Sequence, residues 1–374
     1  MPPPATPGSP VDLVLHIGSG KTGTSSIQRL LQSNRTRLAE LGHLYPQTQP
    51  GRTRHAQLSM SVKDDEALER MPAWDPSRWS SPAEFRKTFR RRLVSEINES
   101  GLSNVLLSDE ALFGSPEEAL RRLRWFTDRI ARSLRLVVYL RRQDDHLVSR
   151  YQQVVKLGET RRLAEPARQV DTPQPRASWA SRQGSNTYDY YTRLRTWERH
   201  LEPDAFVVRR FERASFVEGS LYQDFLVAAG IDVPAEDLKQ VEPVNESLDA
   251  ESVEFLRLLN LLRQEEEVAA ALPPRNRPLV VRLAAACTGP TLTMPESLLD
   301  EFMARWEDSN RRLAVEVLGE DDGPLFRTPR KSGNTTTEQR LDPARLDHFF
   351  TVCELPEALH APLRRITDRE ANTR

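Results

Sequence analysis

The sequence predicts an α/β fold with a mostly parallel central sheet flanked by helices and with a helical C-terminal part. Short apolar runs alternate with segments whose apolar residues recur at helical spacing, which is the pattern of a parallel sheet covered on both faces. A glycine-rich turn follows the first apolar run and leads directly into a helix. After Asn245 the strand-like runs stop and the pattern becomes nearly all helical.

The expected strands are short apolar runs bounded by glycine or by polar and charged residues. They cover residues 11–17, 43–46, 103–108, 134–140 and 205–209. The expected helices carry an apolar stripe, and Gly42 and Gly230 lie where two of them should stop. They cover residues 24–41, 83–98, 117–132, 141–157, 188–200, 220–229, 249–263 and 295–318.

Composition divides the chain into a large domain and two flanking segments. Residues 1–10 are proline-rich and expected to be disordered, and residues 11–326 form the predicted domain, mainly helical over 245–326. Within it, 158–185 is rich in Arg, Pro and Gln and is too long for an ordinary connection, so it is a candidate lid or substrate loop. Residues 327–374 are expected to be a loosely ordered tail with a short helix.

Charge and cysteine content exclude several classes of protein. The 374 residues contain 53 basic and 54 acidic side chains, a net charge of −1, which argues against a nucleic-acid-binding arm or a polybasic membrane anchor. Cys287 and Cys353 lie far apart, and no metal-ligand spacing is present, so neither a disulfide scaffold nor a metal site is expected. Without a visible secretion signal or membrane span, a cytoplasmic location is expected.

The turn after the first strand has the composition of an anion-binding loop. Backbone N–H groups of a tight glycine loop at a helix N-terminus converge on an anion, and G18-S-G-K-T-G-T-S-S26 adds hydroxyl groups and Lys21. The chain contains only six lysines, which makes this one notable. Gly20, Lys21 and Thr22 match the end of a Walker A sequence, but Leu15 stands where that motif requires glycine.

The same residues resemble the sulfotransferases that use 3′-phosphoadenosine 5′-phosphosulfate (PAPS). Their first loop reads P-K-x-G-T-T/S, and K21-T-G-T-S25 matches it, with Gly20 in place of the proline. V14-L-H-I-G18 and S26-I-Q28 resemble the bacterial branch of that family. The resemblance implies the P-loop NTPase-like fold of these enzymes and a contact from Lys21 to the oxygen that bridges phosphate and sulfate. The residues that it assigns to PAPS binding here are Gly20, Lys21, Thr22, Gly23, Thr24, Ser25 and Ser26.

A second motif fits the 3′-phosphate that distinguishes PAPS from ATP. Family members carry an arginine at the end of a later strand and a serine eight residues further on, and Arg141 and Ser149 have that spacing. An arginine fork and a hydroxyl two helical turns along can bind the same phosphate. Gln143 departs from the usual proline of this motif.

Proton transfer needs a base near the acceptor. Glu110 follows the strand 103–108, and ligands of parallel sheets bind beyond the carboxyl ends of strands. In the resembling family this edge carries the base, so Glu110 is the first candidate; alternatively, it or Asp109 caps the next helix or pairs with an arginine. His55 is a second candidate, as base or as a group that orients the acceptor.

These features predict a PAPS-dependent sulfotransferase that transfers a sulfuryl group, in line and without a metal, to a hydroxyl of a carbohydrate or specialised small-molecule acceptor. The product nucleotide would be 3′,5′-ADP, and neither nucleic acid nor a membrane is an expected partner. Two alternatives stay open: a P-loop kinase, with Asp109 as a possible Walker B aspartate, and a non-catalytic nucleotide-binding protein. The identity of the acceptor and the oligomeric state are open at this point.

Overall fold

The computed structural model describes residues 10–47, 52–164, 187–241, 247–264, 271–286, 288–321, 323–330 and 333–372. The chain divides into two compact units, each built from three stretches of sequence. The first contains residues 1–141, 189–244 and 309–328, and the second contains 142–188, 245–308 and 329–374. Most of the predicted lid, 165–185, lies outside the described residues.

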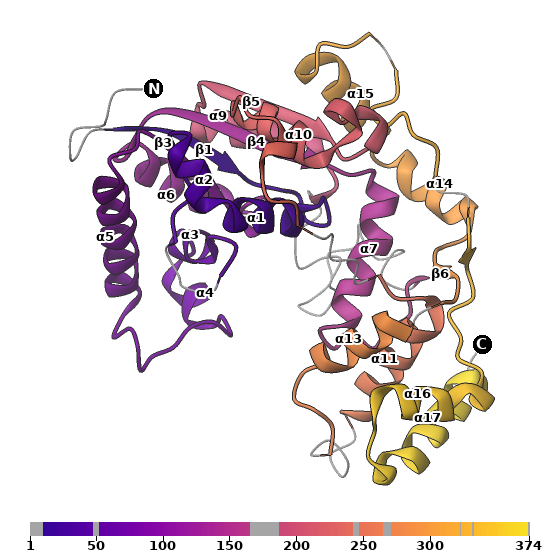
Figure 1. The fold of residues 1–374 in the computed structure, drawn as a ribbon. Coiled ribbons are helices and arrows are strands. Elements are labelled where there is room, and N and C mark those ends of the chain that lie inside the picture. Colours follow the sequence, from indigo (N-terminus) through magenta and orange to yellow (C-terminus); the bar gives the residue numbers. More distant parts are fainter. Residues whose placement is uncertain are drawn as a thin grey trace. The chain divides into compact units, whose positions relative to one another are not determined.

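A five-stranded, all-parallel sheet forms the centre of the first unit (Figure 1). Its strands are β1 (Val11–His16), β2 (His43–Leu44), β3 (Asn104–Ser108), β4 (Ala131–Leu140) and β5 (Ala205–Arg210). They are arranged in the order β2-β3-β1-β4-β5, so the first strand is the middle one. The predicted α/β class with a parallel sheet is therefore confirmed, and each predicted strand is present within a few residues.

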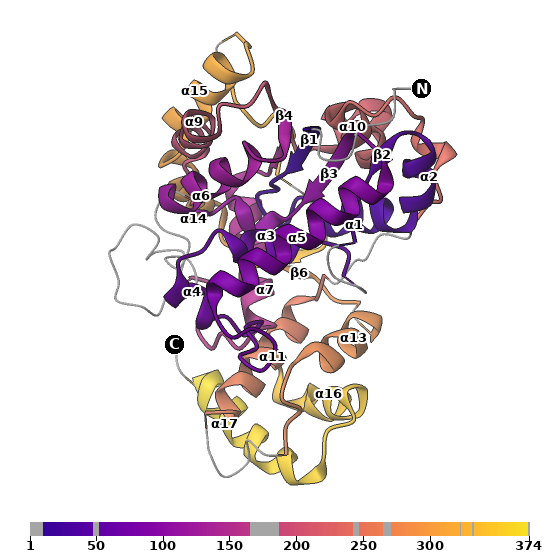
Figure 2. The same cartoon turned by 90° about the vertical axis from the view of Figure 1, so that its left-hand side faces the viewer.

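Helices cover both faces of this sheet because side chains alternate between the faces along each strand. Val14, Leu106 and Val137 pack on α1 (Thr24–Ser33) and α10 (Leu221–Ala229). Leu15, Leu107 and the buried leucines of β4 pack on the opposite layer. That layer consists of α5 (Pro82–Ser100), α6 (Glu117–Thr127) and α9 (Tyr190–Leu201). Figure 2, turned by 90°, shows α5 lying along the sheet.

The second unit is mainly helical. Its α-helices are α7 (Gln143–Val155), α11 (Ala250–Leu262), α13 (Arg277–Ala286), α14 (Glu296–Ala304), α16 (Leu346–Cys353) and α17 (His360–Asn372), and its two-stranded parallel sheet is β6 (Thr291–Leu292) with β7 (Thr335–Thr336). The segment 327–374 differs from the loosely ordered tail that we expected. It supplies α16 and α17, whose apolar residues Leu346, Phe349 and Leu363 are buried in the core of this unit.

The remaining elements are short. They are α2 (Arg35–Glu40), α3 (Ala56–Ser61), α4 (Asp65–Glu69), α15 (Glu307–Arg312), the π-helical turn η6 (Leu313–Val317) and the 3₁₀ turns η1 (Glu110–Leu112), η3 (Arg213–Ser215), η4 (Val217–Gly219), η5 (Ala235–Asp237), η7 (Pro343–Arg345) and η8 (Glu357–Leu359). The helix predicted over 24–41 is divided at Asn34, whose side-chain amide donates to Leu30 O and Lys239 O. Asparagine competes with helical hydrogen bonding in this way.

Candidate functional site

The glycine loop lies at the carboxyl end of β1, the middle strand. The connection after β1 leads to β2 on one side, whereas the connection after β3 crosses β1 to reach β4 on the other side. The strand order therefore reverses beside β1 and β3, and such a switch point is where open parallel sheets bind ligands. Glu110 follows β3 at the same edge of the sheet.

The loop backbone has an anion-binding form. Gly20, Lys21 and Gly23 all adopt left-handed conformations, with φ of 76°, 57° and 73°. A Cβ atom on Gly23 would lie 2.5 Å from Leu221 Cδ2, and at its left-handed φ any other residue would be strained. No side chain caps α1, and its first turn, Thr24 to Ser26, contains no acidic residue. The N–H groups at this positive end of the helix dipole can therefore bind an external anion.

Two contacts fix the loop to the neighbouring strand β4. Ser19 Oγ donates to Tyr139 O at 2.8 Å, and Arg141 Nη1 donates to Lys21 O at 3.2 Å. The two residues predicted to bind opposite ends of the nucleotide, Lys21 and Arg141, are thus adjacent in the first unit. A guanidinium held against this loop adds positive charge where a phosphorylated ligand would bind.

Two polar atoms beneath the loop are buried without a hydrogen-bond partner in the described part of the chain. They are Thr22 Oγ1 and His16 Nε2. A Cβ atom built on Gly18 would lie 3.6 Å from the first and 3.4 Å from the second, so both border the start of the loop. Buried polar groups are normally satisfied, so a water molecule or a ligand would complete the hydrogen bonding of these two atoms. Burial lowers the pKa of His16 to about 4, so its ring is neutral at pH 7.

Glu110 belongs to a hydrogen-bonded cluster with Asp109, Arg54 and Gln28. Arg54 Nη1 lies 2.7 Å from Glu110 Oε1 and 3.7 Å from Asp109 Oδ1, and Gln28 Nε2 donates to Glu110 Oε2 at 2.8 Å. Burial raises the pKa of Glu110, but Arg54 and the Gln28 hydrogen bond outweigh burial, so the net pKa is lowered. The Glu110 carboxylate is therefore ionised at neutral pH and 26% exposed, as a proton acceptor must be.

Asp109 differs from Glu110 in its surroundings. Its side chain is fully buried, it accepts from the backbone N–H groups of Ser59 and Ala111, and burial raises its pKa to about 6. Asp109 caps η1 and not the next α-helix, α6, whose N-cap is Pro116, so the cap that we considered is not formed; the alternative pairing with an arginine is observed at Glu110 with Arg54. Glu110 is thus the carboxylate of the pair that remains accessible.

His55 is not placed to accept a proton or to orient a substrate. Its Nδ1 accepts from Ser108 N–H at 2.9 Å and its Nε2 donates to Pro46 O at 2.9 Å, so the backbone engages both ring nitrogens. The residue is 2% exposed, and burial lowers its pKa to about 4. The prediction of a catalytic His55 is therefore wrong: this imidazole connects the segment after β2 to the end of β3.

Sequence reasoning missed the residues that link the loop to the carboxylates. Gln28 Nε2 lies 3.2 Å from Ser108 Oγ as well as near Glu110, and His16 Nδ1 lies 2.9 Å from the same hydroxyl. Gln28 stands one turn into α1, within the S26-I-Q28 match, and Arg54 precedes His55. Neither position is marked by composition, because only the fold brings them to Glu110.

The second residue proposed for the 3′-phosphate is not tested by this geometry. Arg141 closes the first stretch of the first unit, whereas Ser149 lies on α7 in the second unit. Their joint binding of a phosphate stays a prediction. Among the described residues no cluster of His, Cys, Asp or Glu could hold a metal ion, and no helix there has the length and apolarity to cross a membrane.

Comparison with known proteins identifies one relative of undefined role. A protein of Archaeoglobus fulgidus, described as an uncharacterized protein, is 28% identical to this chain over 222 residues. The match covers 58% of this chain and 54% of the relative, so the chain spans about half the length of the protein that it matches. No family model and no solved structure matches the chain.

Proposed function

We propose that this protein is a cytoplasmic PAPS-dependent sulfotransferase, which transfers a sulfuryl group to a hydroxyl of a carbohydrate or specialised small-molecule acceptor. The observation that carries the proposal is the uncapped, left-handed loop at the switch point beside β1 and β3, with Lys21 in the loop and Arg141 held against it. The residues present fit a phosphorylated nucleotide because they combine backbone N–H groups, hydroxyls and two cations.

Each residue has a distinct role in this proposal. The N–H groups of Thr22 to Ser25 and the hydroxyls of the loop as far as Ser26 would bind the 5′-phosphosulfate, and Arg141 would bind the 3′-phosphate. PAPS supplies the sulfuryl group. The Lys21 ammonium, on its flexible stem, would follow the charge that develops on the leaving phosphate oxygen.

Glu110 would remove the proton from the acceptor hydroxyl. Its ionised state suits this step, and Arg54 and Gln28 hold the carboxylate in one orientation through the hydrogen bonds described above. Arg54 and Gln28 are positioning residues, because they act on the reaction through Glu110.

Nucleotide binding tests the proposal directly. Isothermal titration should show that 3′,5′-ADP binds more tightly than ATP and that magnesium does not change its affinity. Tighter binding of ATP with magnesium would overturn the proposal in favour of a kinase. Binding of 3′,5′-ADP without any transfer from radiolabelled PAPS to a pooled extract of hydroxyl compounds would favour a non-catalytic nucleotide-binding protein.

Lys21→Arg separates binding from chemistry. The variant should keep most of its affinity for 3′,5′-ADP, since the positive charge remains, and lose most sulfuryl transfer, because a rigid guanidinium cannot replace an ammonium on the bridging oxygen. Lys239→Arg, at an exposed position of the same unit, is the matched control. An undiminished rate for Lys21→Arg would remove Lys21 from the proposed mechanism.

A further inference from the structure

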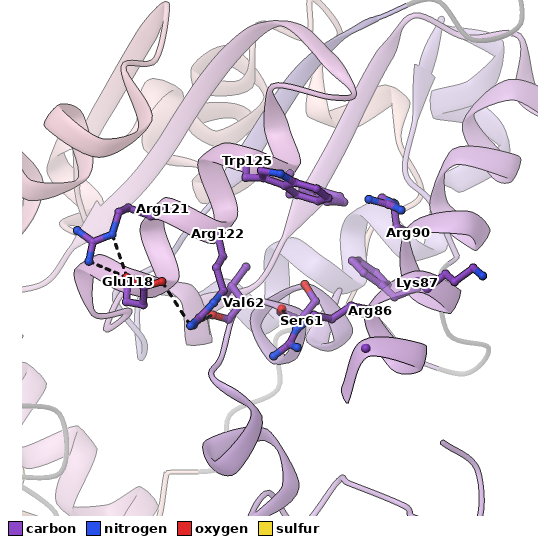
Figure 3. Close-up of a pocket in the computed structure, with 12 residues that line it drawn as sticks. Ser61, Val62, Arg86, Lys87, Arg90, Glu118, Arg121, Arg122 and Trp125 are labelled. Atoms are coloured by element: carbon purple, nitrogen blue, oxygen red, sulfur yellow. Dashed lines mark hydrogen bonds and ion pairs between the residues drawn. The ribbon is translucent and has the colours of Figure 1, made fainter. Parts of the chain in front are cut away.

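A pocket lies on the surface of the first unit, between α5 and α6 and beside the end of α3 (Figure 3). Its volume is about 600 Å³, within the range of about 300–1,000 Å³ usual for small-molecule sites. It contains no residue of the glycine loop, of the Glu110 cluster or of the Arg141 contact. It is therefore separate from the candidate nucleotide site.

The inner wall of the pocket is apolar. Phe89 and Phe126 stack with their ring centres 6.0 Å apart, and both belong to the core, while Val62 closes the side next to α3. Trp125 stays 48% exposed, an unusual exposure for the largest side chain. Arg129 and Arg90 lie 3.7 and 5.3 Å from its ring centre, so cation–π contacts hold the indole in place.

The pocket is strongly cationic, although the whole chain has a net charge of −1. Its lining contains five cations, Arg86, Lys87, Arg90, Arg121 and Arg122, and a single carboxylate, Glu118.

Glu118 is shared by Arg121, at 2.7 Å, and Arg122, at 3.4 Å. Arg86 pairs with Asp65, which lies outside the lining. Lys87 and Arg90 form no ion pair in the described part of the chain. Figure 3 shows Arg90 beside Trp125, and Arg86 near Ser61 and Val62.

We infer that this pocket binds a small amphipathic anion, that is, an aromatic or short acyl body that carries a phosphate, sulfate or carboxylate. The apolar wall between the two helices would bind the body, because burying apolar surface there is favourable. Lys87 and Arg90 would bind the anionic group, since no carboxylate of the described chain neutralises them. The volume and the apolar wall favour a small molecule over an extended polyanion.

The test uses 1-naphthyl phosphate as the probe and isothermal titration as the measurement. The probe should bind the full chain at least roughly tenfold more tightly than neutral 1-naphthol, because only the phosphate can pair with the cations. Equal affinities for the two compounds would overturn the proposal.

Variants locate the probe. The double variant Lys87→Gln, Arg90→Gln should weaken binding at least roughly tenfold. The matched control is Arg91→Gln, Arg92→Gln, which removes the same charge from exposed positions of α5 that do not line the pocket. Equal weakening in both double variants would mean a non-specific charge effect and would contradict the proposal.

Ala83→Trp provides a test that leaves the charge unchanged. Ala83 is an exposed residue in the lining, so a larger side chain there should fill the pocket and block the probe without disturbing the core. Unchanged binding would place the probe elsewhere. Circular dichroism and thermal unfolding show whether each variant is folded.

Two further measurements separate this site from its competitors. Lys21→Ala and saturating 3′,5′-ADP should leave probe binding unchanged; an effect of either would assign the probe to the glycine loop and overturn the second site. Failure of 3′,5′-ADP to bind at all would contradict the proposed function but leave this inference intact. Tighter binding of an acidic peptide or an oligonucleotide through Lys87 and Arg90 would show that the pocket serves a macromolecule.

Discussion

Two clusters in this molecule each place one arginine between two carboxylates, in very different surroundings. In the first unit Arg54 contacts Asp109 and Glu110, and in the second unit Arg257 contacts Glu254 and Glu370, both at 2.7 Å. The Arg257 and Glu254 side chains are 3% and 2% exposed, whereas those of Arg54 and Glu110 are 38% and 26% exposed.

The comparison shows that the exposure of a charged cluster decides whether it can react or only stabilise the fold. Arg257 also donates to Thr160 O and binds both oxygens of Glu254, and Arg162 lies 3.8 Å from Glu254 and from Glu370, so this cluster is saturated. Glu110 is held on both oxygens by Arg54 and Gln28 yet remains open to solvent. An arginine between two carboxylates should therefore stabilise the fold in one unit and take part in proton transfer in the other.

The largest effect is expected for Arg257→Met. It leaves buried Glu254 with only the longer contact to Arg162, at 3.8 Å, and breaking a buried ion pair in this way lowers the free energy of unfolding by about 3–5 kcal/mol. Urea unfolding followed by circular dichroism measures the loss. Arg70→Met, which removes an exposed partner of Glu66, should leave stability nearly unchanged. Equal losses in the two variants would mean that burial does not distinguish them.

Glu110→Gln should have the opposite effect: a large loss of sulfuryl transfer with little loss of stability. Glutamine keeps the shape and a hydrogen-bond acceptor for Arg54, so stability should change little, but it cannot take a proton, and transfer should slow about 100-fold or more. The rate is measured as the transfer of the labelled sulfuryl group from PAPS to pooled hydroxyl compounds. Glu40→Gln, at an exposed pair with Arg37, is the control. A full rate in Glu110→Gln would make the first cluster structural, like the second.

The pH dependence of stability should reveal the buried member of the first cluster. Burial raises the pKa of Asp109 from 3.8 to about 6, an effect that Arg54 only partly offsets. Between these values the folded chain holds a proton that the unfolded chain has released. This group therefore lowers the free energy of unfolding as pH rises from about 4 to 6, by about 3 kcal/mol, and the loss is complete above pH 6.

Asp109→Asn should remove this fall, so its stability relative to the parent chain should increase between pH 4 and pH 6. Buried His16 and His55, with pKa values lowered to about 4, act in the opposite direction, and they cancel in the difference between the two chains. Unfolding free energies at a series of pH values provide the measurement. A difference that does not vary with pH would contradict the raised pKa.

A small effect on stability is expected for Arg54→Met. Its side chain is 38% exposed, so water screens the charge that is lost, and the free energy of unfolding should fall by about 1 kcal/mol or less. Because Arg54 helps to lower the pKa of Glu110, the acidic limb of the pH–rate profile should move to higher pH. An unmoved profile would show that Arg54 does not tune the proposed base.

The fold was largely predictable because strands and helices follow local periodicity. Apolar runs such as 134–140 indicate strands whatever the elements that they pack against. The glycines of the loop indicate its conformation, because glycine tolerates positive φ. The division into two units was not predictable, because the second unit combines 142–188 with 245–308 and the C-terminal segment, and such pairing of distant segments leaves no local signature. The order in α16 and α17 arises from the same distant packing.

For the candidate site, the sequence by itself determined the loop, Lys21 and the carboxylate pair after β3, since short spacing encodes each of them. Only the tertiary structure decided which groups can act. It buries His55 and engages both of its ring nitrogens in hydrogen bonds with the backbone. It buries Asp109 more deeply than Glu110. It also brings Gln28 and Arg54 to Glu110 from other elements. The physical reason is that exposure and charge pairing depend on neighbours distant in sequence, whereas strands, turns and helices depend mainly on neighbours along the chain.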